Sequence, residues 1–169
     1  MFISKLNSMF EYQSSTFATH IPLLRFVGEN IKTVLELGAG QFSTPLFLDK
    51  NYYPKVEKVL TIESDHIWAD KMKNNDSRHN MIVIPEPIES FLSTLNFNDF
   101  DLIFVDNSAY RERRCETLKY VSENTKRSLV VAHDFEMPMY REAASKFDYS
   151  IIDDRHETWT ALLWNTKND

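Results

Sequence analysis

Short apolar runs alternate with amphipathic stretches along the chain, and neither an internal repeat nor a linker interrupts the alternation. The apolar runs predict strands, and the stretches between them predict helices. The predicted strands are 33–37, 58–63, 81–84, 101–105, 128–132, 149–153 and 159–164. The first five are continuously apolar, which is typical of parallel strands covered by helices on both faces.

The predicted helices occupy most of the intervals between these strands. Thr44 followed by Pro45 predicts a helix N-cap and first turn, and Ser64 or Asp65 predicts the cap of a helix that runs to about residue 73. Further helices are predicted at 19–29, 87–95, 109–124 and 138–147. Residues 154–158 are too few for a crossover helix, so we expect the last two strands to form an antiparallel hairpin.

This order of elements predicts one α/β domain that spans residues 1–169. A chain of this length can bury one core but is too short for two domains. In an open, mostly parallel sheet, ligands bind beyond the carboxyl ends of the strands. We therefore expect the functional residues directly after the strands, with residues 1–30 forming a helical segment over the site.

Glycine is scarce in this chain, and its placement marks the end of the first strand. Only three residues are glycine, and two of them, Gly38 and Gly40, follow that strand directly. Glycine lets the backbone turn sharply against a ligand, and the helix N-terminus that follows favours an anionic group. A dinucleotide fingerprint would have a third glycine at Ser43 and no acid at Glu36, so an NAD(P)-dependent oxidoreductase is the least favoured function.

Carboxylates at the ends of the first three strands extend this ligand-binding pattern. Glu36 suits an ammonium group, and Glu63 lies about 25 residues beyond the glycines, where a carboxylate can accept both hydroxyls of a ribose. Glu86 follows the third strand, where the base of a nucleoside would lie. An ammonium group, a ribose and a base together describe S-adenosylmethionine.

With these motifs the sequence resembles the class I, Rossmann-like S-adenosylmethionine-dependent methyltransferases. The matching segments are VLELGAG at 34–40, VLTIES at 59–64, IVIPEPIESFL at 82–92, FDLIFVD at 100–106 and SLVVAHD at 128–134. The resemblance implies a three-layer α/β/α sandwich with strand order 3-2-1-4-5-7-6 and an antiparallel strand 7. It also implies that Glu36, Gly38 and Gly40 line the methionine moiety. By the same resemblance Glu63 binds the ribose and Glu86 lies near the adenine.

The ends of the fourth and fifth strands carry the candidate catalytic groups. Asp106 follows the fourth strand, and His133 and Asp134 follow the fifth. Since imidazole titrates near neutral pH, His133 is the predicted general base, with Asp106 beside it. In the catechol-type O-methyltransferases that the sequence resembles, acids at these places bind Mg²⁺. Asp106 and Asp134 match two of those ligands, but Phe135 replaces the third, and Asp134 equally suits a helix cap.

The net charge and the absence of certain motifs limit the classes of partner that we expect. The net charge is −6, which disfavours nucleic acid, and no Asn/Asp-Pro-Pro-Tyr motif of the adenine N-methyltransferases follows the fourth strand. We therefore expect methyl transfer to a hydroxyl or amine of a small molecule. A non-catalytic module that binds S-adenosylmethionine or another nucleoside is the alternative.

The remaining expectations concern the surroundings of the protein. The single cysteine, Cys115, indicates a reducing compartment, and no apolar run reaches the length of a membrane span, so a cytoplasmic location is expected. Little chain is left to build an acceptor pocket. A homodimer in which the partner completes that pocket is therefore a further expectation.

Overall fold

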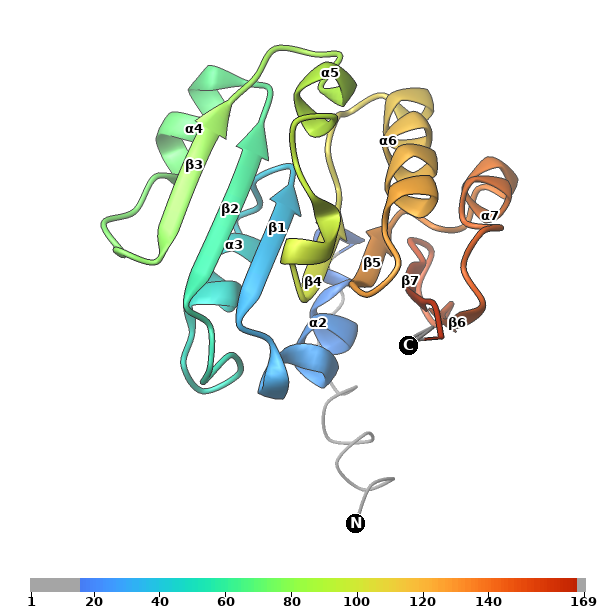
Figure 1. The fold of residues 1–169 in the computed structure, drawn as a ribbon, viewed down its shortest axis with the longest axis horizontal. Helices are drawn as coiled ribbons and strands as arrows, with labels where there is room; N and C mark the ends of the chain where they lie inside the picture. Colours follow the sequence, from blue (N-terminus) through green and yellow to red (C-terminus); the bar gives the residue numbers. More distant parts are fainter. Residues whose placement is uncertain (1–15, 167–169) are drawn as a thin grey trace.

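The computed structural model describes residues 16–166, and their strands form one seven-stranded sheet (Figure 1). The strands are β1 Thr33–Leu37, β2 Lys58–Glu63, β3 His79–Val83, β4 Leu102–Val105, β5 Leu129–His133, β6 Tyr149–Asp153 and β7 Thr160–Trp164. Their order is β3-β2-β1-β4-β5-β7-β6, and β7 runs antiparallel to both β5 and β6. The predicted sheet order and the antiparallel seventh strand are both confirmed.

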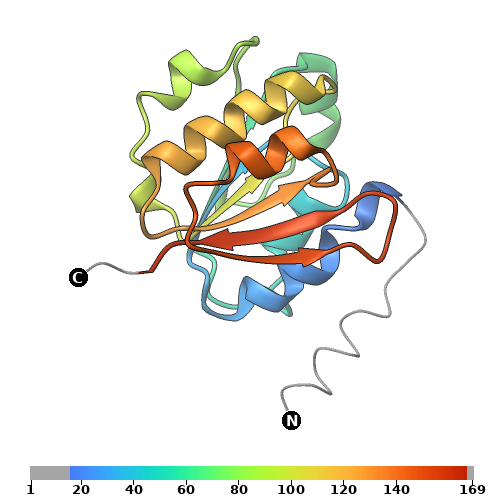
Figure 2. The ribbon, with the colours of Figure 1, turned by 90° about the vertical axis from the view of Figure 1, so that its right-hand side faces the viewer.

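Helices cover the two faces of this sheet. They are α2 Ile21–Val27, α3 Ser43–Leu48, α4 His66–Met72, α5 Glu89–Leu92, α6 Arg111–Asn124 and α7 Pro138–Ala143, with 3-10 turns at Thr16–Ala18, Gly28–Asn30 and Phe97–Asp99. Figure 2 shows α6 and α7 on one side of the sheet and α2 on the other. The predicted three-layer α/β/α arrangement is therefore present. Within residues 16–166, no helix has the length and apolar character needed to cross a lipid bilayer.

Alternation along the strands divides the core into two apolar clusters, one on each face. In β1, Leu35 and Leu37 pack in the cluster that includes residues of α6 and α7, whereas Val34 packs in the cluster that includes residues of α2 and α3. Burying one such side chain stabilises the fold by about 1.5–3 kcal/mol. Because both faces are covered, the sheet edge formed by the strand ends is left open for a site.

Several predicted element boundaries differ from the structure. The N-cap of α3 is Phe42 rather than Thr44, because the Thr44 hydroxyl points inward and contacts Glu36. Asp65, in contrast, caps α4 as predicted, by accepting hydrogen bonds from the backbone N–H groups of Ile67 and Trp68.

Helices α5 and α7 end earlier than predicted, at residues 92 and 143 rather than 95 and 147. Strand β3 starts two residues earlier than predicted. After α5 the hydroxyls of Ser93 and Thr94 donate to nearby backbone carbonyls, which competes with further helix. After α7 the Phe147 N–H donates to the carbonyl of Ala144, a turn that returns the chain toward the core. Strand β3 begins at His79, whose ring is hydrogen-bonded to Thr61 of the neighbouring strand.

The segment expected to cover the site divides into parts with different positions. Residues 1–15 lie outside the described part of the chain. Helix α2 packs on a face of the sheet, with Leu23 and Leu24 buried among residues of the core. Phe17 and His20, in the turn before α2, line a cavity at the open edge. The expectation that residues 1–30 cover the site stays a prediction.

Candidate functional site

The chain turns at Gly38, directly after β1, in a conformation that excludes other residues. Gly38 has a φ of +91°, in the left-handed region that favours glycine. A Cβ at this position would lie 2.5 Å from the carbonyl oxygen of Asp106. The Gly38 N–H donates to the carbonyl of Ile62 at 2.9 Å. The turn is thus packed directly against the end of β4, which brings the first and fourth strand ends together.

Glu36 lies beneath this turn, fully buried, and holds it through hydroxyl groups. Its carboxylate accepts hydrogen bonds from Ser43 at 2.6 Å, Thr61 at 2.7 Å and Thr44 at 2.9 Å. Thr44 in turn accepts from the backbone N–H of Gly40 at 3.1 Å. Burial raises the pKa of Glu36 to about 7, although the three hydroxyl hydrogen bonds lower it. The predicted contact of Glu36 with a ligand stays a prediction, and its visible contacts fix the shape of the turn.

Glu63, at the end of β2, holds two backbone segments in place, one after β1 and one after β2. One carboxylate oxygen accepts a hydrogen bond from the N–H of Ala39 at 2.8 Å. The other accepts from the N–H groups of Ser64 and Asp65 at 2.7 and 2.9 Å. The side chain is nearly buried but still lines a cavity. It therefore links the glycine turn to the start of α4.

A first cavity of about 480 Å³ runs along the rim from the end of β2 to the end of β4. We call it the rim cavity. Its lining includes Gly38, Glu63, Glu86, Asp106 and Arg114. One carboxylate oxygen of Glu86 is buried there without a hydrogen-bond partner among the described residues. An unpartnered buried acceptor of this kind is costly, and a ligand donor would relieve that cost.

A second cavity of about 340 Å³ adjoins the first, and we call it the apolar cavity. The two cavities have Phe17, Ala39, Trp68 and Asp106 in common. The walls of the apolar cavity also include His20 and Phe42. Trp68 is held in place because its indole N–H donates to the carbonyl of Ala39 at 2.6 Å. Asp106 is the only carboxylate among the residues that line both cavities.

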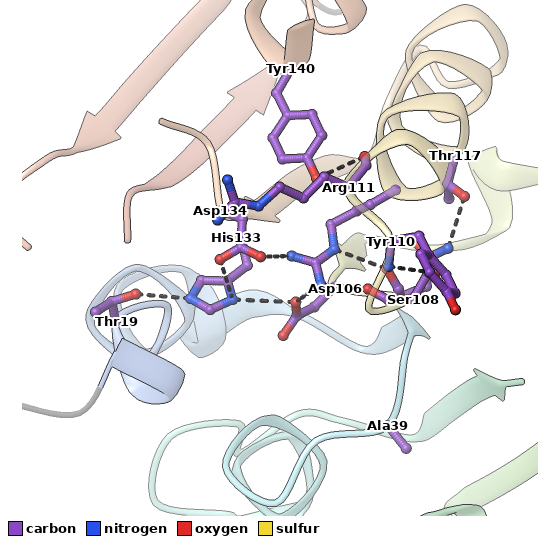
Figure 3. Close-up of polar contacts among 12 residues, drawn as sticks. Thr19, Ala39, Asp106, Ser108, Tyr110, Arg111, Thr117, His133, Asp134 and Tyr140 are labelled. Atoms are coloured by element: carbon purple, nitrogen blue, oxygen red, sulfur yellow. Dashed lines mark hydrogen bonds and ion pairs between the residues drawn. The ribbon is translucent and has the colours of Figure 1, made fainter. Parts of the chain in front are cut away.

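Asp106, directly after β4, and His133, at the end of β5, form a hydrogen-bonded pair (Figure 3). The Nδ1 atom of His133 lies 3.3 Å from an Asp106 oxygen, and its Nε2 atom lies 2.9 Å from the Thr19 hydroxyl. With Nδ1 protonated, Nε2 accepts from Thr19. Burial lowers the pKa of His133, but the hydrogen bond and negative charge of Asp106 outweigh burial and raise it above its ordinary value.

The two members of this pair have different access to the cavities. The His133 side chain is 6% exposed and lines neither cavity, whereas the Asp106 side chain is 23% exposed and lines both. Burial raises the pKa of Asp106, but the hydrogen bond and charge of His133, with Arg114, lower it overall. Asp106 is thus positioned to contact a ligand, and His133 is positioned to hold Asp106.

His20, just before α2, also lies in the site and lines the apolar cavity. Its ring packs edge-on against His133, with ring centroids 4.8 Å apart, and against Phe104 at 4.9 Å. Neither ring nitrogen has a hydrogen-bond partner among the described residues. Burial and the charge of His133 lower the pKa of His20 to about 3, so its ring is neutral near pH 7.

The residues do not fit a divalent cation between Asp106 and Asp134. The guanidinium of Arg114, from α6, lies there and forms ion pairs with both carboxylates. His20, His133 and Asp106 also bring ligand atoms within 4.8 Å of one another. A cation among them would face the like charge of Arg114, 3.1 Å from Asp106, and His133 already uses both ring nitrogens.

The sequence interpretation did not single out Arg114, yet a signal for it exists. Arg114 lies on the buried face of α6 with Thr117, Leu118 and Val121, which follow at helical spacing. A charged residue at a core-facing position of a predicted helix needs a buried partner. That pattern would have pointed to Arg114 rather than to its exposed neighbour Arg113.

The fold matches solved structures over nearly the whole chain, whereas no family model and no curated protein sequence matches. Cofactor-bound Rv0187 from MTB is 18% identical, with a TM-score of 0.60 over 96% of this chain and 86% of that chain. The O-methyltransferase TomG from Streptomyces achromogenes, in complex with SAM, is 16% identical, with a TM-score of 0.57 over 96% and 89%. The SAH-bound methyltransferase PaMTH1 from Podospora anserina is 15% identical, with a TM-score of 0.58 over 96% and 87%.

At these identities the likeness concerns the fold, and it agrees with the strand order and the antiparallel β7 described above. The chain has the fold of the class I S-adenosylmethionine-dependent methyltransferases.

Proposed function

We propose that this protein transfers a methyl group from S-adenosylmethionine to a hydroxyl or amine of a small molecule. The observation that carries the proposal is the junction of the rim cavity and the apolar cavity at Asp106. One cavity is lined by the carboxylates expected to bind a nucleoside, and the other has largely apolar walls. A donor and an acceptor bound in them would meet at one carboxylate.

The residues of the rim cavity suit S-adenosylmethionine. Gly38 lines the cavity where the methionine moiety would pass, and Glu63 lies where a ribose would be bound. The unpartnered oxygen of Glu86 offers an acceptor to the amino group of the adenine. Gly40 and Glu36 contribute by holding the turn, since Glu36 accepts from Thr44 and Thr44 accepts from Gly40. Each of these roles is part of the proposal.

When bound, the cofactor supplies an electrophilic methyl group on a positively charged sulfur. The protein then has to align the acceptor with that methyl group. It also has to receive the proton that the hydroxyl or amine of the acceptor loses. Asp106 is the group we assign to both tasks, because its carboxylate faces the cavities and can accept a hydrogen bond from a hydroxyl or ammonium group. His133 positions Asp106 through the hydrogen bond at 3.3 Å. The apolar walls keep water from the methyl group.

The size and composition of the apolar cavity support a small acceptor. Its volume is about 340 Å³, and its walls include the rings of Phe17, Phe42 and Trp68. Pockets of this size hold small molecules or single side groups. The net charge of −6 disfavours the phosphate backbone of nucleic acids.

Transfer of a labelled methyl group tests the proposal directly. The purified chain is incubated with methyl-labelled S-adenosylmethionine and the low-molecular-weight fraction of a cell extract, and labelled products are separated by chromatography. We expect a labelled product with the wild type, and none with Asp106→Asn. Cofactor binding with no labelled product from any small-molecule fraction would contradict catalysis and favour a non-catalytic binding module.

A further inference from the structure

The Arg114 guanidinium is fixed by contacts on all of its nitrogen atoms. Its Nε donates to the carbonyl of Asn107 at 2.9 Å, and one terminal nitrogen donates to the carbonyl of Ser108 at 2.8 Å. That same nitrogen lies 3.1 Å from an Asp106 oxygen, and the other terminal nitrogen forms an ion pair with Asp134. The side chain is only 10% exposed. Arg114 is therefore a buried, immobile positive charge at the junction of the two cavities.

The backbone around Arg114 is shaped to these contacts. Ser108 and Asp134 are the only non-glycine residues with positive φ in the described part of the chain, at 64° and 58°. Both contact the guanidinium, Ser108 through its carbonyl and Asp134 through its carboxylate. A left-handed conformation costs a non-glycine residue on the order of 1 kcal/mol, and it persists where surrounding contacts enforce it. The two conformations thus belong to one arrangement centred on Arg114.

The positive charge of Arg114 offsets the repulsion between two neighbouring carboxylates, Asp106 and Asp134. Asp106 and Asp134 both contact one guanidinium, and without a cation between them their negative charges would repel each other. A divalent metal ion is one solution, and a guanidinium, whose planar fork of donors matches carboxylates, is another. His133 also hydrogen-bonds to Asp106, at the same carboxylate oxygen that Arg114 contacts.

We infer that Arg114 takes the place of a divalent cation in this site and positions Asp106 and Asp134 for a metal-independent reaction. The last part of this inference rests on the proposed function. A metal ion can bind two adjacent acceptor oxygens, whereas the nitrogens of Arg114 are already used by the protein. The acceptor therefore needs one hydroxyl or amine that reaches Asp106, and it needs no pair of chelating oxygens.

Binding of Mn²⁺ tests, without reference to activity, whether Arg114 takes the place of a cation. The protein is first stripped of metal with EDTA, the EDTA is removed, and Mn²⁺ binding is then measured by electron paramagnetic resonance. Wild type is expected to leave Mn²⁺ free. Arg114→Met keeps much of the side-chain volume but removes the charge, and we expect it to bind about one Mn²⁺ at least about tenfold more tightly than wild type. Arg114→Lys keeps a positive charge and is expected to resemble wild type. Arg113→Ala, on the same helix but with an exposed side chain, is the matched control.

One further variant locates the bound ion, and folding measurements on every variant exclude an effect of misfolding. Asp134→Asn in the Arg114→Met background is expected to lose the Mn²⁺ gained by the single variant. Circular dichroism and urea unfolding establish that each variant is folded. If Arg114→Met does not fold, the Mn²⁺ titration of wild type still tests the inference. The inference requires that the wild-type protein leave Mn²⁺ free.

Three results would overturn the inference. They are tight one-site Mn²⁺ binding by wild type, no gain of Mn²⁺ by folded Arg114→Met, and equal Mn²⁺ binding by Arg114→Lys and Arg114→Met. A chain that binds Mn²⁺ as expected but transfers no methyl group would contradict the proposed function and leave the cation substitution supported. A wild type whose methyl transfer is abolished by EDTA and restored by Mn²⁺ would contradict metal independence itself.

Discussion

The two sides of the rim are built in different ways. On the β1–β3 side, the carboxylates of Glu36 and Glu63 bind hydroxyls and backbone N–H groups that belong to the turn itself or to the adjoining strand. On the β4–β5 side, the site depends on side chains from four separate segments, represented by Thr19, Asp106, Arg114 and His133. The first side is a shaped backbone, and the second is a charge network.

This difference suggests a division of work. A shaped backbone can bind a cofactor whose form does not vary, whereas a charge network can orient an acceptor and hold a proton. We therefore expect changes on the β1–β3 side to alter cofactor affinity and changes on the β4–β5 side to alter turnover.

The largest expected effect comes from a pair of carboxylate substitutions, one on each side. Asp106→Asn should lower kcat about 10²- to 10³-fold and leave the Kd for the cofactor nearly unchanged, because it removes the proton acceptor. Glu63→Gln should raise that Kd about tenfold or more and reduce kcat much less. Steady-state kinetics and calorimetry measure both. If the two variants change the same parameter, the division between the sides is wrong.

Alanine at the glycine turn is expected to act next most strongly. Gly38→Ala places a Cβ 2.5 Å from a backbone oxygen of Asp106 at a φ of +91°, so we expect a loss of about 2–4 kcal/mol in the free energy of unfolding. Gly40→Ala is the comparison variant, since its Cβ would lie against the Ser43 hydroxyl rather than against backbone. Moving that hydroxyl costs its hydrogen bond to Glu36, so we expect a smaller loss than in Gly38→Ala. Urea unfolding of the two variants provides the comparison. Equal losses would show that the contact between the turn and β4 is not what requires glycine.

His20 is expected to make folding stability fall in acid. Its pKa is about 3 in the folded chain, below the ordinary value of 6.5, so between these values the unfolded chain binds a proton that the folded chain excludes. The contribution of His20 to stability should therefore fall by about 2 kcal/mol between pH 7 and pH 5. Glu36, with a pKa of about 7 in the folded chain, contributes in the opposite direction over the same interval, so the His20 part is read from the difference between wild type and a variant. His20→Phe should lack this part of the drop. Urea unfolding at both pH values measures it, and an identical drop in the two proteins would refute the assignment.

The smallest effect concerns the pH dependence of turnover. The pKa of His133 is raised, and its protonation makes Asp106 a weaker proton acceptor. We expect kcat/KM to rise with pH through a midpoint above 6.5. In His133→Gln this ionisation should disappear from the profile, although the glutamine amide can still donate to Asp106. A profile that keeps the same midpoint in the variant would assign the ionisation to another group.

The sequence predicted the β1–β3 side better than the β4–β5 side, and the reason is the range of the contacts. Glu36, Gly38 and Glu63 are marked by their places at the ends of apolar strands, and the sheet order was implied by the resemblance to the methyltransferases. The contacts of His133 with Thr19 and of Arg114 with Asp134 join residues 114 and 20 positions apart. No local period encodes such contacts. Only the helical phase of Arg114 on α6 carried a usable signal.

The central claim is that the rim cavity binds S-adenosylmethionine. Isothermal titration calorimetry of the folded wild-type chain with S-adenosylmethionine tests it most directly, with NADH as a parallel titrant. The account predicts saturable binding of one S-adenosylmethionine per chain and no heat with NADH. Folded protein that gives no heat with S-adenosylmethionine, or that binds NADH in its place, would contradict it.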